Sequence, residues 1–380
     1  MKFRIERDTL ADAVAWTARS LPNRPSVPVL AGLLVETADD GLTLSGFDYE
    51  TSTRATLPAE VSADGRALVS GRLLAEIVKS LPPKPVDVSL EGTKVQVVCG
   101  SARFSLQTMP VDEYPQLPDM PTATGTVRSE DFSTAVSQAS AAAGRDEMLP
   151  LLTGVRLELE GSTISLMATD RFRASLRDLQ WFPQASDLSA NALVPARVLN
   201  ETARSLTGGG DVTIAVSSGE SGDGLIGFEG IVGNGTRRTT TRLLEGDFPR
   251  VRQLFQAQAE TVAYVQTQAF VDSVKRVALV AERNTPVRLT FSDGMLLLEA
   301  GSGDDAQASE SIEATINGAD ISIGFNPTYL LEGLAVMSEP VVHLSFTQHT
   351  KPAAISGVPE IGADPDVAFR YLIMPVRLQS

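Results

Sequence analysis

The sequence contains few of the residues that catalysis, metal binding or disulfide bonding usually require. Among 380 residues there is one cysteine, Cys99, so an internal disulfide is impossible and a reducing cytoplasm is the expected location. The two histidines, His343 and His349, belong to no cluster with metal-ligand spacing, and no GxxxxGK[ST] phosphate-binding loop occurs. The sequence therefore predicts no metal site, no cofactor and no catalytic residue.

Long apolar runs are also missing. No run approaches the roughly 18 apolar residues of a membrane-spanning helix, and the N-terminal segment MKFRIERDTL alternates charged and apolar residues, unlike a signal peptide. We therefore expect no membrane partner. With 43% hydrophobic and 21% charged residues, the composition is that of a globular protein long enough for two or three domains. The formal net charge of −15 argues, by itself, against a nucleic-acid partner.

An internal repeat organises the chain. The segment ALVSGRLLAEIVKSL at residues 67–81 returns as ALVPARVLNETARSL at residues 192–206, and eight of the fifteen positions are identical. Each copy predicts a strand, a break and a helix, with Ser70 as the N-cap of one helix and Pro195 at the entry of the other. Helical periodicity places five apolar residues of the first copy on one face. They are Leu73, Leu74, Ile77, Val78 and Leu81.

A third, weaker copy of the repeat begins near Ile321, with Asn326 as the helix N-cap and Pro327 in the first turn. Around these helices the repeat extends over the whole chain, because an offset of 122 aligns Leu30, Gly32, Glu36 and Asp48 with Leu152, Gly154, Glu158 and Asp170. A third round follows, in which Phe270 and Val274 stand 138 residues after Phe132 and Val136. A period near 125 residues is domain-sized rather than that of a solenoid. The sequence predicts an α+β fold of three tandem copies of one domain, each with two helices packed on antiparallel sheets, at residues 1–121, 122–255 and 256–380.

One carboxylate, Asp170, can be considered as a catalytic group. Asp48 occupies the same place in the first copy, which favours a turn-capping role at the end of a strand. An enzyme built from repeats usually gives one copy a nucleophile or base that the others lack, and we find none.

Basic residues recur in register on the two repeated helices. Arg72 and Lys79 of the first helix correspond to Arg197 and Arg204 of the second, and basic residues outnumber acidic ones there by four to two, against 32 to 47 in the whole chain. For a single helix a solvated surface is the favoured interpretation. Recurrence in register means that related domains present these residues from the same side. If the domains join in a ring, a mildly basic inner surface and an acidic exterior reconcile the net charge with a nucleic-acid partner.

The order of several motifs resembles a known family. A triplicated domain that opens MKFRIERD and contains NRPSVPVL, MATDRFR, TRLLEGDFP and a terminal MPVRL is similar to the bacterial DNA polymerase III β subunit, the replicative sliding clamp. The resemblance covers essentially the whole chain. It implies a ring-forming head-to-tail homodimer that encircles duplex DNA regardless of sequence and is not itself an enzyme. It also implies partners: the replicative polymerase catalytic subunit, a clamp-loader complex and other proteins carrying a clamp-binding motif.

The resemblance further implies a peptide-binding pocket between the second and third domains, with Arg173 as a polar anchor. The matching positions are Leu152, Thr169, Arg173, Ala174, Pro249, Leu254, Pro352, Leu372 and Met374. Without the resemblance, an interdomain core is the favoured interpretation of these residues.

The remaining residues that the resemblance implies face DNA or a second copy of the chain. The DNA-facing candidates are Arg24, Arg72, Arg145, Arg197 and Arg242. The dimer interface is expected to pair the strand of Arg103, Phe104 and Leu106 with the acidic strand of Asp304, Asp305 and Glu310, supported by Leu279.

Two positions depart from the family pattern. Arg171 stands where many members have glycine, and Ala174 stands where a larger apolar residue is usual. The second change predicts a reshaped pocket with reduced affinity for cyclic peptide inhibitors, so the chain is either a housekeeping clamp or a second, inhibitor-tolerant copy. Two alternatives from other classes remain: a peptide-binding scaffold that does not encircle DNA, and a hydrolase with an unrecognised site around Asp170 or His343.

Overall fold

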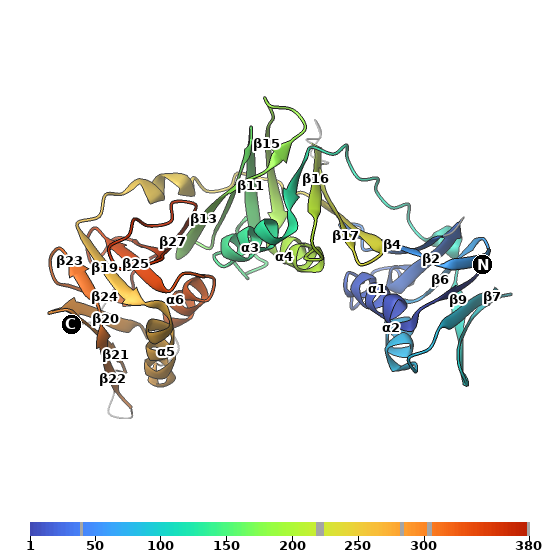
Figure 1. The fold of residues 1–380 in the computed structure, drawn as a ribbon, viewed down its shortest axis with the longest axis horizontal. Coiled ribbons are helices and arrows are strands. Elements are labelled where there is room, and N and C mark those ends of the chain that lie inside the picture. The colour runs from blue at the N-terminus through green and yellow to red at the C-terminus, as the bar shows by residue number, and fades with distance from the viewer. Residues whose placement is uncertain (39–40, 218–223, 282–284, 302–305, 378–380) are drawn as a thin grey trace. The chain divides into compact units, whose positions relative to one another are not determined.

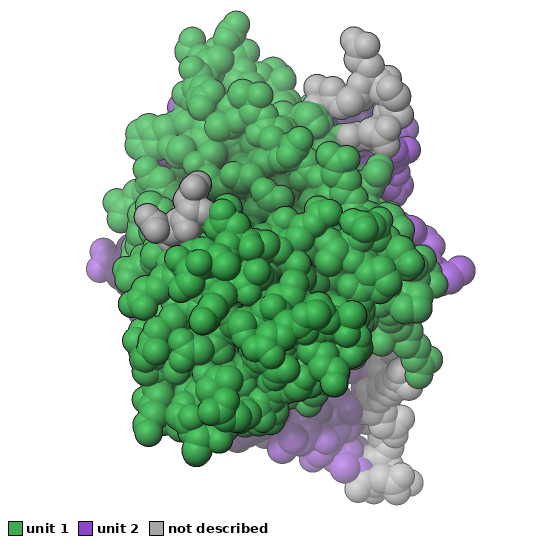
Figure 2. Space-filling view, turned by 90° about the vertical axis from the view of Figure 1, so that its right-hand side faces the viewer, with its two compact units in different colours: residues 1–133, 181–194, 201–243 green, residues 134–180, 195–200, 244–380 purple. Residues whose placement is uncertain are grey.

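The computed structural model describes residues 1–38, 41–217, 224–281, 285–301 and 306–377. Helices lie beside antiparallel strands throughout this part of the chain (Figure 1). The chain forms two compact units, coloured separately in Figure 2 and described in turn. Unit 1 holds residues 1–133, 181–194 and 201–243, and unit 2 holds residues 134–180, 195–200 and 244–380.

Unit 1 is built on one continuous antiparallel sheet of 14 described strands. In spatial order they are β14 (Phe182–Pro183), β10 (Gly125–Arg128), β16 (Asp211–Ser217), β17 (Leu225–Val232), β18 (Gly235–Arg242), β4 (Thr51–Pro58), β3 (Gly41–Phe47), β2 (Gly32–Ala38), β6 (Gly65–Ser70), β9 (Ala102–Met109), β8 (Lys94–Cys99), β7 (Val86–Glu91), β1 (Lys2–Ile5) and β5 (Glu60–Ala63).

Two helices pack together on this sheet, α1 (Arg7–Arg19) and α2 (Gly71–Ser80). The expected apolar face of α2 is largely correct, since Leu74, Ile77, Val78 and Leu81 are buried in the core. Leu73 is an exception to the prediction, because 47% of it is exposed. Ser70 stands at the N-cap as expected, but its side chain makes no capping hydrogen bond. Helical periodicity therefore identified the buried face of α2 correctly, but it placed Leu73, at the margin of that face, in the core by mistake.

Strands β4 and β18 join the first and second copies of the repeat. They pair continuously from Thr51 opposite Thr241 to Thr56 opposite Thr236. The Thr51 and Thr241 hydroxyl oxygens lie 2.9 Å apart at one end of this ladder. Because main-chain hydrogen bonds cross the junction, the two copies share one sheet.

Unit 2 contains two antiparallel sheets. In the larger one the spatial order runs through β11 (Gly154–Glu160), β12 (Thr163–Thr169), β13 (Arg173–Gln180), β27 (Phe369–Ile373), β26 (Ala353–Val358), β25 (Val341–Phe346), β19 (Thr261–Gln266) and β23 (Thr315–Asn317). The smaller has four described strands, β22 (Ala308–Glu313), β21 (Met295–Ala300), β20 (Val287–Ser292) and β24 (Ile321–Phe325).

The pairing of β13 with β27 joins the second and third copies, from Arg173 opposite Ile373 to Arg177 opposite Phe369. It is the counterpart of the β4–β18 ladder. Two helices, α5 (Thr267–Val277) and α6 (Pro327–Leu334), pack together in the third copy (Figure 1). Asn326 caps α6 as predicted, because its side-chain oxygen accepts hydrogen bonds from the Thr328 and Tyr329 amides.

The other elements are short or belong to the second copy. Helix α3 covers Ser129–Ser140, and α4 covers Ala196–Ser205, directly after Pro195 and strand β15 (Ser189–Pro195). The 3-10 helices are η1 (Pro28–Ala31), η2 (Val111–Glu113), η3 (Pro150–Thr153), η4 (Val251–Gln256) and η5 (Ala278–Val280). The predicted mixture of helices and antiparallel strands is therefore correct.

Candidate peptide-binding site

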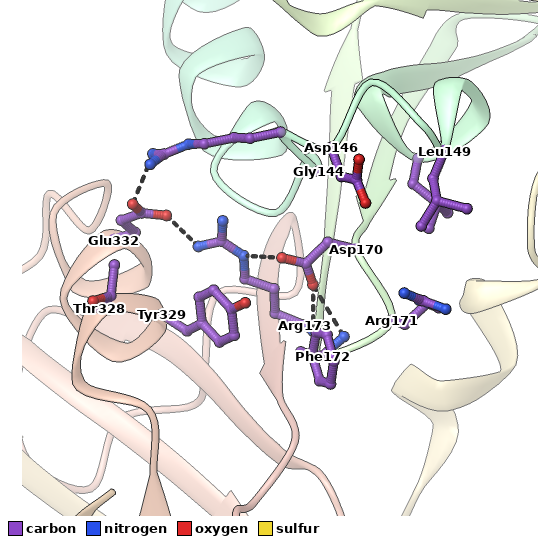
Figure 3. Close-up of a pocket in the computed structure, with 12 residues that line it drawn as sticks. Gly144, Asp146, Leu149, Asp170, Arg171, Phe172, Arg173, Thr328, Tyr329 and Glu332 are labelled. Carbon is purple, nitrogen blue, oxygen red and sulfur yellow. Dashed lines mark hydrogen bonds and ion pairs between the residues drawn. The ribbon is translucent and has the colours of Figure 1, made fainter. Parts of the chain in front are cut away.

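The turn between β12 and β13 positions the central residues of the candidate site. The Asp170 Oδ1 atom accepts hydrogen bonds from the amides of Phe172 at 3.0 Å and Arg173 at 3.1 Å. The Thr169 hydroxyl donates to the Arg173 carbonyl at 2.7 Å. Arg171, between them, has a positive φ of 79°. This turn directs the Arg173 side chain toward the third copy of the repeat, as Figure 3 shows.

The first copy contains the same turn between β3 and β4. Asp48 Oδ1 accepts from the amides of Glu50 at 3.0 Å and Thr51 at 2.6 Å. Tyr49, the counterpart of Arg171, has a φ of 76°. The turn-capping role predicted for Asp48 and Asp170 is confirmed.

Arg173 is the centre of a buried ionic cluster (Figure 3). Only 4% of the residue is exposed. Its Nε atom donates to Asp170 Oδ2 at 2.9 Å, and its Nη1 atom donates to Glu332. The guanidinium also lies 4.5 Å from the centre of the Tyr329 ring, and Glu332 receives a second ion pair from Arg145 at 2.7 Å. Two carboxylates therefore compensate the charge that burial would otherwise make costly.

Tyr371 completes the cluster. Arg173 Nη1 lies 3.4 Å from the Tyr371 hydroxyl, which donates to the Tyr329 carbonyl at 2.9 Å. Burial raises the pKa of Tyr371, although the neighbouring Arg173 cation opposes that rise. Burial by itself would lower the pKa of Arg173, but Tyr371, Glu332 and Asp170 together raise it. Both groups thus keep their protons at neutral pH, and Tyr371 acts as a fixed hydrogen-bond donor.

A pocket of about 350 Å³ opens beside this cluster (Figure 3). One part of its lining is ionic, and another is apolar and aromatic, with the Phe172 and Tyr329 rings stacked 6.1 Å apart. Its lining residues are Gly144, Arg145, Asp146, Leu149, Leu152, Asp170, Arg171, Phe172, Arg173, Thr328, Tyr329 and Glu332.

A second pocket, of about 400 Å³, lies against η4 and the third copy's strands β25, β26 and β27. Leu254, Pro352 and Leu372 of the predicted set line it. Its other lining residues are Gln253, Phe255, Gln256, Ala257, Ala259, Ser345, Thr347, Lys351 and Ala354.

The structure distributes the nine predicted pocket residues over both cavities and their surroundings. Leu152 and Arg173 line the first pocket, and three others line the second. Thr169, Ala174, Pro249 and Met374 line neither of these two pockets. Ala174 is 2% exposed and pairs with Thr169 on one side and Leu372 on the other. The Met374 amide donates to the Phe172 carbonyl at 2.8 Å.

Three successive parts of the chain match models of one family. The models describe the N-terminal domain of the DNA polymerase III beta subunit over residues 1–118, its central domain over 126–250 and its C-terminal domain over 252–377. The chain belongs to the DNA polymerase III beta subunit family. This confirms the predicted family and the predicted fold of three tandem clamp-type domains.

Individual relatives agree with that assignment. The beta sliding clamp of Streptomyces coelicolor is 57% identical over 380 residues, which cover 100% of both chains. The beta sliding clamp homolog GriR of Streptomyces muensis is 44% identical over 377 residues, 99% of each chain. The sliding clamp of Pseudomonas aeruginosa in its crystal structure bound to griselimycin superposes with a TM-score of 0.89, at 26% identity and over 100% of each chain.

A member of the beta sliding clamp family is a non-catalytic processivity subunit of DNA polymerase III, and this chain serves DNA replication in that role. The hydrolase alternative is therefore wrong. The Asp170 carboxylate is engaged in an ion pair with Arg173 and in hydrogen bonds from the amides of its own turn. Burial lowers the pKa of His343, whose ring lies edge-on to Tyr264 at 5.1 Å. Among the described residues no cluster could hold a metal ion, and none of their helices is long and apolar enough to span a membrane.

The candidate DNA-facing arginines of this clamp are all exposed, but they differ in their contacts. Arg72 donates to Asn23, and the Arg242 Nε atom donates to the Tyr49 carbonyl at 3.3 Å. Arg145 belongs to the pocket cluster through Glu332. Arg24 and Arg197 lie in the exposed segment before η1 and in the first turn of α4.

The candidate interface residues lie on two sheet edges. Residues 102–107 of β9 pair with β8, and β9 reaches β6 only at Thr108 and Met109. Strand β22 is an edge of the four-stranded sheet. Arg103 is exposed, Phe104 is half-buried, and Leu106 is buried in its own domain core. Asp304 and Asp305 lie outside the described residues.

Glu310 lies on β22, and Leu279 lies in η5, directly after α5, the helix that contacts β22. Leu279 is 84% exposed. Glu310 accepts from Arg276 at 2.5 Å and from the Ser273 hydroxyl at 2.7 Å. These contacts, the Arg276 hydrogen bond first, lower the pKa of Glu310 to about 2.

Glu332, Tyr329 and Tyr371 were not among the predicted pocket residues. One signal was available, because Glu332 recurs at the position of Glu76 and Glu201 in the repeated helix. The pairing of Glu332 with Arg173, 159 positions away, depends on how two copies meet and has no local pattern.

The conformation of Arg171 leads to a testable prediction. A left-handed φ costs a residue other than glycine about 1–2 kcal/mol, and the greater freedom of glycine in the unfolded chain offsets about 0.5–1 kcal/mol of any relief. Arg171→Gly should therefore unfold at the same or a slightly higher temperature than the parent. Arg171→Ala, the matched control, keeps the strain and loses the guanidinium. The unfolding temperatures of the two variants are measured by thermal denaturation. If Arg171→Ala is more stable than Arg171→Gly, the backbone at this position is not strained.

Proposed function

We propose that two copies of this chain close head to tail into a ring that holds duplex DNA by enclosure. The three domains at residues 1–121, 122–255 and 256–380 supply half of the ring. The observation that carries the proposal is the strand pairing between copies of the repeat, β4 with β18 and β13 with β27. Among the described strands, residues 102–107 of β9 lack a partner on the side of β6, and β22 is a terminal strand of its sheet, so both offer an open edge. Unpaired strand edges favour association. If β9 of one protomer pairs with β22 of the other, the same contact, repeated by the symmetry of the dimer, pairs both open edges of each protomer.

Side chains beside these edges support the same contact. Leu279 and Phe104 provide apolar surface, and Arg103 is an exposed cation that complements the acidic strand containing Glu310. Leu106 supports β9 from the core side. Burying an apolar side chain of this size is worth about 1.5–3 kcal/mol. Because a head-to-tail dimer has two identical interfaces, each residue contributes twice.

The charge of the chain agrees with enclosure. A net charge of −15 disfavours tight adhesion to DNA. Exposed cations on α2 and α4, with Arg24 and Arg242, supply a few phosphate contacts that carry no sequence information. A ring needs no more than this, because topology rather than affinity retains it. We place this activity in the cytoplasm, with no cofactor, and with a clamp-loader complex opening the ring.

The two pockets suit a short peptide from the polymerase catalytic subunit or from another protein with a clamp-binding motif. Both border the β13–β27 ladder, because Arg173 lines the first and Leu372, opposite Ala174, lines the second. An extended peptide could place apolar side chains in both cavities while its polar groups meet Arg171 or Arg145 at the rim. The fixed ionic cluster would keep this surface preorganised.

We further propose that the pocket is a variant with reduced affinity for cyclic peptide inhibitors. Support comes from Ala174, a small side chain at a position that the sequence resemblance assigns to the pocket. The Pseudomonas aeruginosa clamp, which has the same fold and was crystallised bound to griselimycin, makes that compound a suitable probe for this proposal. Natural partners would tolerate a weaker pocket through multiple contacts with the ring.

Enclosure predicts that binding depends on DNA topology. After loading, the clamp should remain on a closed circle at high salt and leave once the circle is linearised. Arg24, Arg72 and Arg197 changed together to alanine should weaken loading and reduce the salt slope of direct binding by about 0.9 for each lost phosphate contact. Arg4, Arg128 and Arg288, exposed on β1, β10 and β20, provide a matched triple-alanine control. Equal retention on linear and circular DNA would refute enclosure.

The interface predicts a monomeric variant. Leu279→Asp places a charge in the proposed apolar contact and should give folded monomers by sedimentation velocity, with loss of processive synthesis. Met148→Asp is the matched control, since Met148 is 85% exposed and belongs to the second copy of the repeat, whereas β22 belongs to the third. A Leu279→Asp dimer as tight as the control would show that the interface lies elsewhere.

The pocket predicts a gain of affinity. Ala174 is buried and lines neither pocket, but it lies opposite Leu372, which lines the second one. If griselimycin reaches this position, Ala174→Leu adds apolar contact, each buried methylene being worth about 0.8 kcal/mol, and the ligand should bind about ten to one hundred times more tightly. Calorimetry measures the affinity, and thermal unfolding checks that the buried site accepts the larger side chain. If the folded variant binds griselimycin with unchanged affinity, Ala174 does not determine how well the inhibitor binds.

A further inference from the structure

The first helix of each copy carries a distinctive residue at the same position. Trp16 in α1, Gln138 in α3 and Arg276 in α5 each stand six residues after the aligned apolar residues Leu10, Phe132 and Phe270. The three side chains are chemically different. Two of them lie at a junction between copies of the repeat, and their contacts there indicate what the third one does.

At the junction of the first and second copies, Trp16 packs under Arg237 of β18. The Arg237 guanidinium lies 5.0 Å from the centre of the Trp16 ring and forms an ion pair with Asp12. Its Nη1 atom donates at 3.4 Å to the carbonyl of Ser205, the last residue of α4. Trp16 and Asp12 of the first copy thus hold an arginine of the second copy, which reaches the C-terminal end of α4 in that same copy.

At the junction of the second and third copies, Gln138 performs the same task directly. Its Nε2 atom donates at 3.3 Å to the carbonyl of Val336, two residues beyond the end of α6. Gln138 is 4% exposed. The last carbonyls of a helix have no partner within the helix, and a donor or cation there is favourable. At each junction, therefore, a side chain donates a hydrogen bond to a carbonyl at the C-terminal end of the second helix of a copy, α4 at the first junction and α6 at the second.

Among the described residues, the hydrogen bonds of Arg276 stay within the third copy. Its side chain is 59% exposed. Nε donates to Glu310 Oε2 at 2.9 Å, and Nη2 contacts Glu310 Oε1 at 2.5 Å and the Ser273 hydroxyl at 3.4 Å. Nη1 makes no hydrogen bond to any described residue. The guanidinium is thus held by a carboxylate on the edge strand β22 with donors left over.

We propose that Arg276 of one protomer donates to the main-chain carbonyls at the C-terminal end of α2, at Ser80, in a second copy of this chain. Ser80 is the repeat counterpart of Val336, whose carbonyl accepts from Gln138 of the preceding copy. Glu310 is the positioning residue that orients the guanidinium. This inference rests on the proposed head-to-tail dimer, and it adds a polar contact to the β9–β22 pairing.

Nearby charges are compatible with this contact. Lys79 is exposed in the last turn of α2 and carries the same charge as Arg276. Its repeat counterpart, Arg204, occupies the last turn of α4 without preventing Arg237 from reaching Ser205. At the proposed junction Glu310 neutralises Arg276, as Asp12 neutralises Arg237 at the first junction.

The test compares dimer dissociation constants measured by sedimentation of the full chain. Arg276→Ala should raise the dissociation constant at least about tenfold, since hydrogen bonds from charged groups are among the stronger ones and the ring contains two copies. Arg276→Lys should recover part of the loss, because an ammonium donates but lacks the guanidinium fork. Lys275→Ala, an exposed neighbour on the same helix, should stay within about twofold of the parent.

A double-variant cycle separates this contact from a role inside the protomer. If Arg276 acted only through Glu310, then Arg276→Ala, Glu310→Gln and the double variant would weaken the dimer equally. The proposal expects Arg276→Ala to weaken it more than Glu310→Gln does. Thermal unfolding of each variant confirms that the protomer is folded.

Cross-linking then tests the geometry. A protomer with Arg276→Cys mixed with a protomer with Ser80→Cys should be joined by a short bis-maleimide, while Cys99 is buried in its core. A parent chain that is monomeric at all concentrations would refute the proposed dimer. A parent dimer with an unaffected Arg276→Ala variant, or without cross-linking, would refute only the present inference.

Discussion

Main-chain hydrogen bonding between successive copies of the repeat is the constraint on which the rest of the structure depends. The β4–β18 and β13–β27 ladders each replace an exposed strand edge with a continuous sheet. Side chains at such a ladder can vary, because the backbone supplies the bonds. Hence threonines line one joint, whereas Arg173, Leu176 and Tyr371 line the other. Each joint also fixes the neighbouring helices and turns, including the turn that aims Arg173.

Buried arginines reinforce both joints, and each is compensated. Arg237 is paired with Asp12 and stacked on Trp16, and Arg173 is paired with Asp170 and Glu332 and stacked on Tyr329. A buried cation without its carboxylate would cost several kcal/mol, so each cluster is stable only when two copies meet correctly. The clusters therefore specify how copies are joined. At Arg173 the same specificity produces a rigid wall for the pocket.

The surface combines a large negative charge with a few recurring cations. For a protein that adheres to DNA this balance is unfavourable, but a processivity factor must move along DNA after loading. Weak, sequence-independent contacts are compatible with such movement. The proposed peptide site follows a different principle: the two pockets lie beside a fixed ladder, which offers a preorganised surface to partners of different sequence if they bind there.

The sequence by itself determined the number of copies, the approximate positions of their helices and strands, and the family, because the repeated motifs are still recognisable as similar residues at regular spacing. It also predicted the Asp48 and Asp170 turns and the Asn326 cap, since these interactions span only two or three residues. Contacts between distant segments were decided by the tertiary structure alone. Leu73 is exposed although its helix periodicity places it inward, Leu106 is buried in its own core, and Arg173 meets Glu332 159 positions away. Local patterns report which face of an element is apolar, but the partner of that face depends on how the copies pack.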